Sequence, residues 1–190
     1  MKGRLITFEG GEGSGKTTQR DLLSNYLESK GYEVLKLREP GGVEISEEIR
    51  KLLLDPKIRG EIDPLTELLL FSASRAQFVR EKLMPALDGE KIVLLDRYYD
   101  STTAYQGYGG GVNLDSINKI QTIATDGIKP HITFLIDVSP EVGTSKLTVK
   151  EFGDKDRIER KGLSFHEKVR KGYLETAKKE PERIKVINYV

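Results

Sequence analysis

Apolar residues along this 190-residue chain gather into five short runs that are separated by longer stretches of mixed polarity. The five runs are Leu5–Phe8, Val34–Leu37, Ile92–Leu95, Ile132–Val138 and Ile184–Ile187. They are largely apolar at consecutive positions, which is typical of strands buried on both faces in a parallel sheet. The pattern therefore predicts an α/β fold of three layers (α/β/α), in which helices cover both faces of a five-stranded parallel sheet.

Amphipathic stretches between the runs predict the covering helices. The clearest of them are Thr17–Lys30, Pro64–Leu87, Leu114–Thr125 and Ser164–Lys179. No repeat, low-complexity tract or domain boundary interrupts the alternation, so we expect residues 1–190 to form a single domain. The glycine-rich stretch Gly107–Gly111 is too short for a linker between domains and predicts a mobile loop.

The connection from the first run to the first helix, GGEGSGKT, fits the pattern G-x-x-x-x-G-K-[ST]. Its glycines let the backbone point successive N–H groups inward, and the following helix adds the positive end of its dipole. This chemistry suits a polyphosphate such as ATP, with Lys16 against the β- and γ-phosphates and Thr17 on the accompanying Mg²⁺. The expected nucleotide-binding residues are Gly10, Gly11, Glu12, Gly13, Ser14, Gly15, Lys16, Thr17 and Thr18.

A glycine-rich turn that binds nothing is the alternative, but it does not explain Lys16 and Thr17 at the required spacing. The fold is therefore predicted to be of the P-loop NTPase type. The loop does not name the reaction, because switch GTPases, motor ATPases and nucleotide kinases all use it.

The third strand ends in Asp96, and Arg97 follows it. An apolar run that closes on an aspartate resembles a Walker B element, whose carboxylate lies near the Mg²⁺; an aspartate that caps the next helix is the alternative. A guanidinium beside this carboxylate can hold two phosphates together and neutralise charge during transfer. Lys16, Asp96 and Arg97 are thus candidate catalytic residues, and Thr17 and Asp96 are candidate metal ligands. The chemistry favours phosphoryl transfer between two bound nucleotides.

Two further positions fit a second binding site. Arg38 follows the second strand, at the end of a parallel sheet where ligands collect, although the Pro-Gly-Gly after it makes an ordinary turn an equal alternative. Phe71 and Arg75 are four residues apart in a predicted helix and so share a face. A ring and a guanidinium side by side can stack on a base and bond to its edge, whereas a core phenylalanine and a solvated arginine are the alternative.

The most charged segment, residues 146–161, holds six basic residues among four acidic ones. The basic residues are Lys146, Lys150, Lys155, Arg157, Arg160 and Lys161. Charge runs usually form solvated helix faces. The alternative is a mobile lid over about 143–161, because a kinase must shield the transferring phosphoryl group from water and brings cations over it on closing.

Composition narrows the possible functions. Lys and Arg number 31 against 30 Asp and Glu, and the net charge of +1 gives no overall attraction to nucleic acid or acidic membranes. Cysteine is absent, which excludes disulfides and thiolate metal sites. The two histidines lack metal-ligand spacing, and we expect His131 in a loop and His166 exposed on a helix. Without a signal peptide or an apolar run of membrane length, we expect a cytoplasmic protein.

Five motifs follow one another along the chain: FEGGEGSGKTTQ from Phe8, REPGG from Arg38, LLFSASRAQ from Leu69, DRYYDSTTAYQG from Asp96 and DRIE from Asp156. In this order they resemble the thymidylate kinases, a family of P-loop nucleoside monophosphate kinases, over essentially the whole chain. The resemblance implies that ATP donates its γ-phosphoryl group to thymidine 5′-monophosphate (dTMP) with Mg²⁺, giving dTDP and ADP. It also implies a homodimer.

The resemblance assigns roles around the acceptor phosphate and sugar. Arg38 and Arg97 match the arginines that hold the acceptor phosphate, and Asp96 matches the carboxylate near the metal. Glu12 matches the acidic loop position that approaches the sugar 3′-hydroxyl. This match explains why a carboxylate stands inside an anion-binding loop.

The resemblance also assigns roles around the base. Phe71 matches the ring that stacks on thymine, and Arg75 matches the residue that reads its edge. Tyr105 matches the aromatic residue whose bulk disfavours a ribose 2′-hydroxyl, and Gln106 matches a neighbour of the base. Ser101 is the remaining residue expected to bind the substrate.

The loop position of Gly13 distinguishes two types within the family. One type carries a basic residue there, so Gly13 resembles the type that supplies cations from the lid. Members of that type have arginines where this chain has Lys146 and Lys150, and lysine gives a point charge without the bidentate fork of arginine. Lys150 is the candidate for the catalytic lid cation, with Lys146, Lys155, Arg157 and Arg160 as alternatives.

Two other functions stay open at this point. A kinase of another deoxynucleotide or nucleoside would use the same scaffold. A nucleotide-gated switch would hydrolyse ATP or GTP slowly, although the sequence shows no obvious guanine-reading N-K-x-D element.

Overall fold

All five strands lie parallel in one sheet with the order β2-β3-β1-β4-β5. The computed structural model describes residues 2–58, 61–148 and 156–188, with the backbone alone for 144 and 146–148. The strands are β1 Arg4–Glu9, β2 Val34–Arg38, β3 Ile92–Asp96, β4 Ile132–Asp137 and β5 Ile184–Asn188. The five predicted strands and the parallel sheet are therefore confirmed.

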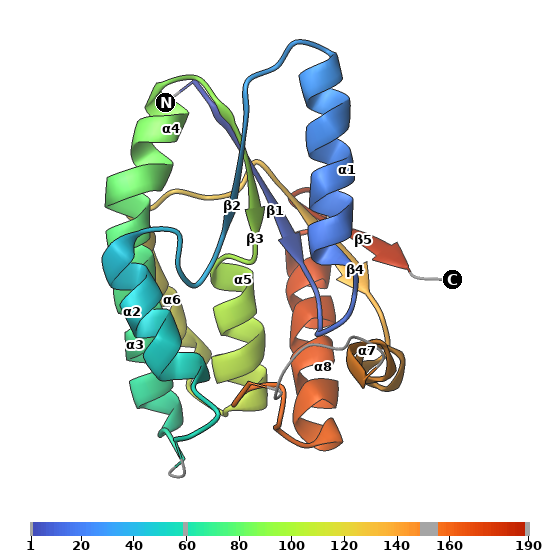
Figure 1. Cartoon of the computed structure of the whole chain (residues 1–190). Helices are drawn as coiled ribbons and strands as arrows, with labels where there is room; N and C mark the ends of the chain where they lie inside the picture. The colour runs from blue at the N-terminus through green and yellow to red at the C-terminus, as the bar shows by residue number, and fades with distance from the viewer. Residues whose placement is uncertain (1, 59–60, 149–155, 189–190) are drawn as a thin grey trace.

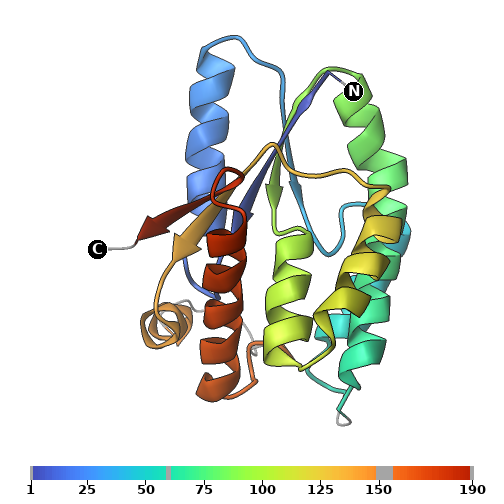
Figure 2. The ribbon, with the colours of Figure 1, turned by 180° about the vertical axis from the view of Figure 1, so that it is seen from behind.

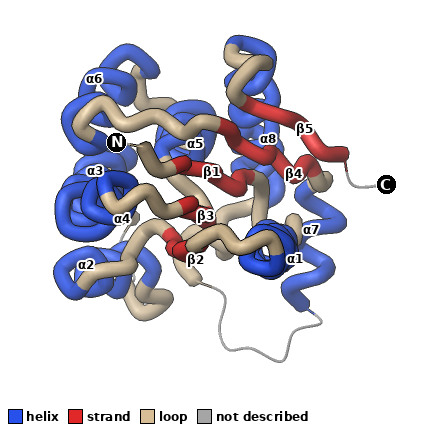
Figure 3. Tube along the Cα trace, turned by 90° about the horizontal axis from the view of Figure 1, so that it is seen from above, coloured by secondary structure: helices blue, strands red, loops and turns tan. Residues whose placement is uncertain are grey.

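Helices cover both faces of the sheet. Their bounds are α1 Lys16–Ser29, α2 Glu44–Leu54, α3 Pro64–Phe78, η1 Val79–Leu83, α4 Met84–Asp88, α5 Tyr99–Thr102, η2 Thr103–Gly109, α6 Leu114–Thr125, α7 Pro140–Thr148 and α8 Leu163–Lys179, where η1 and η2 are π-helical. Helix α1 lies on one face (Figure 1), and α5, α6 and α8 are seen on the other (Figure 2). The view along the sheet shows the three layers (Figure 3).

The core explains why the strands are apolar at consecutive positions. Phe8 and Leu94 point to one face, where Leu23 of α1 packs against them. Leu5 and Val93 point to the other face, into a core shared with α3, η1 and α4. Successive strand residues point to opposite faces, and here both faces are covered, so both sets must be apolar.

The prediction of a mobile loop at Gly107–Gly111 is wrong for its first three residues, because η2 continues through Gly109. A Cβ atom on Gly107 would lie 2.7 Å from Cδ2 of Leu114, and one on Gly109 would lie 2.6 Å from the ring of Phe165. These glycines therefore serve close packing of α6 and α8 against η2. Among the described residues, no helix has both the length and the apolar character that a membrane span requires.

Candidate active site

The carboxyl ends of three neighbouring strands bring the sequence motifs together. In the sheet register, Arg38 of β2 stands opposite Asp96 of β3, and Asp96 stands opposite Phe8 of β1. The phosphate loop, Gly10–Gly15, leaves β1 at this end and leads into α1 (Figure 1). Parallel α/β sheets bind ligands at this end, which is where the sequence predicted the site.

A cavity of about 520 Å³, here called the loop cavity, opens over the phosphate loop. It is lined by the predicted loop residues from Glu12 to Thr18 and, opposite them, by Arg38, Glu39, Arg50, Asp96 and Arg97. Gly10 and Gly11 are not among the residues that line this cavity. The carbonyl oxygen of Gly10 accepts a hydrogen bond from Arg97, and that of Gly11 accepts one from Lys16. The φ values of Gly13 and Gly15, 65° and 92°, belong to the left-handed region that glycine enters without steric cost.

Lys16 is held close to the loop backbone. Its Nζ atom donates to the carbonyl oxygen of Gly11 at 2.8 Å and to Oγ of Ser14 at 3.4 Å. Burial lowers the pKa of Lys16 to about 8, and the neighbouring Arg97 charge acts in the same direction. A bound polyphosphate would raise this pKa again, because an opposite charge favours the protonated amine.

Thr17 and Asp96, the two predicted metal ligands, lie together beside the loop. The Thr17 hydroxyl donates to Oδ2 of Asp96 at 2.6 Å. Both side chains offer the oxygen ligands that Mg²⁺ prefers, and Mg²⁺ usually keeps several waters and takes substrate phosphates as further ligands. No group of three or more His, Cys, Asp or Glu side chains that could hold a metal ion occurs in the described part of the chain.

A second cavity of about 170 Å³, here called the inner cavity, adjoins the first. Its lining includes seven of the eight predicted substrate-binding residues: Glu12, Phe71, Arg75, Arg97, Ser101, Tyr105 and Gln106. Arg38 does not line the inner cavity, but it does line the loop cavity. Phe71 is half-buried in the cavity wall and Arg75 is buried. The alternative interpretation, a phenylalanine in the core and an arginine in solvent, is therefore wrong for both residues.

Glu12 and Arg97 line both cavities and bind each other. Nη2 of Arg97 donates to Oε1 of Glu12 at 2.7 Å, and the Tyr105 hydroxyl donates to the same oxygen at 2.5 Å. Burial alone would raise the pKa of Glu12, but the charges of Arg97 and Lys16 outweigh it and lower the pKa to about 2. An ionised carboxylate therefore holds the guanidinium at the junction of the two cavities.

A buried ion pair orients Arg75 in the inner cavity. Its Nε atom lies 2.7 Å from Oε2 of Glu39, and its Nη1 atom donates to Oγ1 of Thr102 at 3.0 Å. Burial raises the pKa of Glu39 to about 7 against the effect of the Arg75 charge. Oε1 of Glu39 has no hydrogen-bond partner among the described residues, although Glu39 lines both cavities.

Arg50 is a site residue that the sequence analysis missed. It lies on α2, lines both cavities, and donates from Nη1 to the carbonyl oxygen of Pro40 at 3.0 Å. Arg38 is more exposed, and its Nη2 atom binds both carboxylate oxygens of Glu47 at 2.9 and 3.0 Å. Arg50 lies in none of the five motifs, and it reaches the cavities only because the fold places α2 over the carboxyl end of the sheet.

Part of the segment predicted as a lid lines the inner cavity. Asp156, Ile158 and Glu159 of the DRIE motif line it. The cations beside them face Glu67, a buried residue of α3: Nη2 of Arg157 contacts Oε2 of Glu67, and Nζ of Lys161 lies 3.4 Å from both of its carboxylate oxygens. These two cations therefore bind α3 and do not contact the phosphate loop.

Of the other predicted lid cations, the structure describes only the side chain of Arg160. Arg160 donates to the carbonyl oxygen of Pro56 at 3.2 Å. Lys150 and Lys155 lie outside the described residues, and so does the side chain of Lys146. The assignment of the catalytic lid cation to Lys150 stays a prediction.

The first residues of the lid touch the phosphate loop directly. A Cβ atom on Gly13 would lie 2.2 Å from the carbonyl oxygen of Gly143 in α7, and one on Gly143 would lie 2.2 Å from that of Glu12. Contacts this short exclude any side chain at either position unless α7 moves. The structure thus gives a physical reason for glycine at position 13.

The histidines differ in how well they were predicted. His131 lies in the connection before β4, where its Nδ1 atom accepts a hydrogen bond from Leu5 N–H at 3.1 Å, and the loop prediction is confirmed. His166 is not exposed as expected. It is half-buried beside Gly11 and Glu12 in a small cavity, and burial lowers its pKa. A sequence without its fold does not show that α8 passes this close to the loop.

A family model described as thymidylate kinase matches residues 8–189. The chain belongs to the thymidylate kinase family. It is 46% identical over 188 residues to a thymidylate kinase from Thermoanaerobacter sp. (strain X514), a match that covers 99% of this chain and 90% of that one. A thymidylate kinase from Chlorobium luteolum is 48% identical over 97% of this chain and 88% of its own length.

A solved member of the thymidylate kinase family has the same fold. The crystal structure of thymidylate kinase from Ehrlichia chaffeensis superposes with a TM-score of 0.80 at 38% sequence identity, and the match covers 98% of this chain and 93% of that one. The family resemblance and the three-layer P-loop fold expected from the motifs are both confirmed.

Proposed function

We propose that this chain transfers the γ-phosphoryl group of ATP to dTMP, giving ADP and dTDP. The observation that carries the proposal is the meeting of two cavities at Glu12 and Arg97. The loop cavity suits the triphosphate of the donor, and the inner cavity suits a base between Phe71 and Arg75. Relatives at 46% and 48% identity that are named thymidylate kinase support the choice of substrate.

The transfer is direct and in line, without a covalent enzyme intermediate. The phosphoryl transition state is loose and highly charged, so the protein's task is positioning and electrostatic stabilisation. Lys16 neutralises negative charge on the donor phosphates. Arg97 holds the acceptor phosphate at the junction of the cavities, and Arg38 and Arg50 supply further positive charge on the opposite wall of the loop cavity.

Mg²⁺ is part of the proposal, and Thr17 with Asp96 would hold it. When bound, the ion neutralises charge that develops on the transferred phosphoryl group. Removing it with a chelator is therefore expected to abolish turnover, and adding Mg²⁺ back is expected to restore it.

Selectivity for thymine and deoxyribose is assigned to the inner cavity. The half-buried ring of Phe71 offers a stacking face. Arg75, fixed by Glu39 and Thr102, reads the edge of the base. Tyr105 is held by Glu12 on the side where the sugar lies, and its bulk disfavours a ribose 2′-hydroxyl.

The setting of the reaction is also proposed. Exposed leucines on adjacent helices support a homodimer: Leu52 of α2 is 49% exposed, and Leu65 and Leu69 of α3 are 49% and 51% exposed. Apolar side chains gathered on one face are typical of an interface. A cytoplasmic location fits a chain without cysteine.

A coupled assay of ADP release across nucleoside monophosphates tests the function. We expect ADP release to depend on added monophosphate and to be fastest with dTMP. A preference for another monophosphate would favour a different nucleotide kinase. Slow release that does not respond to any monophosphate would favour a nucleotide-gated switch.

A further inference from the structure

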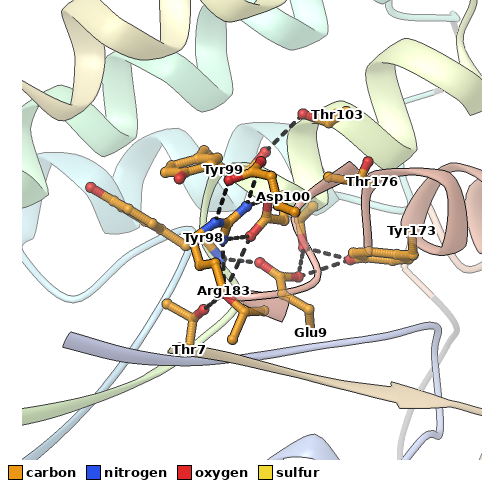
Figure 4. A network of polar contacts seen from close by, with 12 residues as sticks. Thr7, Glu9, Tyr98, Tyr99, Asp100, Thr103, Tyr173, Thr176 and Arg183 are labelled. Carbon is orange, nitrogen blue, oxygen red and sulfur yellow. Dashed lines mark hydrogen bonds and ion pairs between the residues drawn. The ribbon is translucent and has the colours of Figure 1, made fainter. Parts of the chain in front are cut away.

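Behind Arg97 lies a second carboxylate, Glu9, that the proposed mechanism does not use. It is the last residue of β1, and it is fully buried. Its Oε1 atom accepts a hydrogen bond from the backbone N–H of Tyr98 at 2.7 Å. Its Oε2 atom accepts from the hydroxyls of Ser101 at 2.6 Å and Tyr173 at 2.9 Å (Figure 4). Three donors from two distant parts of the chain thus converge on one carboxylate.

The same two hydroxyls also contact Arg97. Nη1 of Arg97 donates to Oγ of Ser101 at 3.3 Å and to the hydroxyl oxygen of Tyr173 at 3.1 Å. A hydroxyl has a single hydrogen and can donate only once. The two hydroxyl oxygens also lie 2.8 Å from each other, and either can donate. An ionised carboxylate is the strongest acceptor within reach, so Glu9 draws the hydroxyl hydrogens away from Arg97 and leaves it their lone pairs.

The backbone of Arg97 needs support as well. Its φ of 66° lies in the left-handed region, which is uncommon for a residue with a side chain. The bond from Tyr98 N–H to Glu9 fixes the chain immediately after it. Glu12 holds the other end of the guanidinium. Arg97 is therefore held by two carboxylates. Glu12 binds its guanidinium directly, and Glu9 acts through the hydroxyls of Ser101 and Tyr173 and through the backbone amide of Tyr98.

We propose that Glu9 is a positioning residue for phosphoryl transfer: its ionised carboxylate turns the hydroxyls of Ser101 and Tyr173 so that they hold Arg97 at the junction of the two cavities. The inference rests on the proposed function, in which Arg97 binds the acceptor phosphate. Oε1 must accept from the Tyr98 amide, so a proton on Glu9 sits on Oε2. That proton gives the two hydroxyls a donor in place of an acceptor and removes the negative charge that attracts the guanidinium, so the hold on Arg97 weakens.

The surroundings of Glu9 set the pH range of this effect. The titratable and charged groups that face it are Lys16, Arg97, Tyr99, Asp100 and Tyr173. Burial and the charge of Asp100 raise the pKa of Glu9 to about 7, against the Ser101 hydrogen bond and the Arg97 charge. Arg183 binds both carboxylate oxygens of Asp100, at 2.7 and 2.8 Å (Figure 4). The hold on Arg97 thus weakens as the pH falls through about 7.

Glu9→Gln tests the inference, because the amide keeps the shape of the side chain. Its oxygen must face the Tyr98 amide, so its NH₂ group faces the two hydroxyls and imitates protonated Glu9 at every pH. At pH 8 we expect kcat/KM for dTMP to fall about tenfold or more, with KM for ATP changed by less than about twofold. Glu9→Gln removes the contribution of Glu9 to the acid limb of the kcat/KM profile near pH 7, whereas Glu39, whose pKa is also about 7, contributes to that limb in both proteins. Both keep the limb near pH ~6 that comes from the phosphate of dTMP.

Two further variants make the result decisive. Tyr173→Phe keeps the ring but removes one hydroxyl, and we expect a change in the same direction but smaller. Ser46→Ala removes a buried hydroxyl that bonds to the Ser74 carbonyl oxygen away from the site, and we expect the wild-type profile. Should Glu9→Gln fail to fold, the wild-type profile and Tyr173→Phe decide the question.

Several outcomes would overturn the role of Glu9. One is an active wild type whose profile and kcat/KM Glu9→Gln leaves unchanged, and another is an equal loss of apparent affinity for both substrates. A wild type without a limb near pH 7, together with an unaffected Tyr173→Phe, would also overturn it. A wild type that transfers no phosphoryl group to dTMP would instead overturn the proposed function itself.

Discussion

Arg97 lies at the junction of the two cavities, and the sequence did not predict most of its contacts. The motif around Asp96 marked Arg97 as a candidate, because an arginine after a Walker B aspartate has an evident chemical use. Its partners Glu9 and Tyr173 carry no such mark. They come from the end of β1 and the middle of α8, and only the fold brings them together.

Arg97→Ala is expected to lower kcat by about 10³, by analogy with arginines that stabilise phosphoryl transition states. Arg97→Lys keeps the charge but loses the planar fork, so it should recover only part of the activity. Steady-state kinetics with both substrates measures the change. The control is Arg80→Ala, because the Arg80 side chain is 53% exposed and lies outside both cavities. Turnover retained in Arg97→Ala would contradict the role given to Arg97.

Glu39→Gln is expected to change how stability depends on pH. The folded pKa of Glu39 is about 7, above its ordinary value of 4.5, so between these pH values the folded protein holds a proton that the unfolded chain has lost. The free energy of unfolding of the wild type therefore falls as the pH rises through that window. The variant lacks this contribution, and its stability relative to wild type should improve from pH 4.5 to pH 7. Denaturant unfolding measures it; a constant difference across the window would show that Glu39 is ionised throughout.

At the scale of elements, local pattern predicted helices and strands better than it predicted their contacts. The apolar spacing of Pro64–Leu87 predicted one helical stretch, and the structure has α3, η1 and α4 in succession there. The glycines of η2 suggested a loop, since glycine is a common loop residue. Their actual role depends on Leu114 and Phe165, which approach only in the folded molecule.

Gly143→Ala tests the contact between α7 and the phosphate loop. The added Cβ would lie 2.2 Å from a backbone oxygen, so α7 or the loop must shift, and we expect a loss of about 1–3 kcal/mol in the free energy of unfolding. KM for ATP should rise, because the displaced backbone belongs to the loop cavity. Gly162→Ala is the matched control, since a Cβ there meets no atom within 4 Å. Equal stability and equal KM in the two variants would exclude a structural role for this contact.

At the scale of the whole molecule, the hydrophobic pattern was sufficient for the fold class and the five parallel strands. The motifs also marked many of the residues that line the two cavities, because the chemistry of a motif is local. Arg50, Glu39 and the half-buried position of His166 were not, since they depend on which surfaces α2, β2 and α8 turn toward the cavities. The sequence thus predicted the residues on motifs better than the residues that only the packing of helices and strands brings to the cavities.

The proposed homodimer predicts a mass in solution of twice the 21.4 kDa of the chain. Leu69→Glu should shift the protein toward monomer, because it places a charge on the exposed leucine face of α3. Leu22→Glu on α1 is the control, since Leu22 is 58% exposed on another helix. Light scattering after size exclusion measures both. A dimer that tolerates Leu69→Glu would place the interface elsewhere.

The central claim is that the junction of the two cavities passes a phosphoryl group directly from one nucleotide to another. Incubation of the wild type with ATP labelled at the γ-phosphate, dTMP and Mg²⁺ tests it most directly. We predict that the label appears in dTDP as ADP forms, and that Arg97→Ala nearly abolishes the transfer. Label that appears only as inorganic phosphate, at a rate that does not depend on dTMP, would contradict the account.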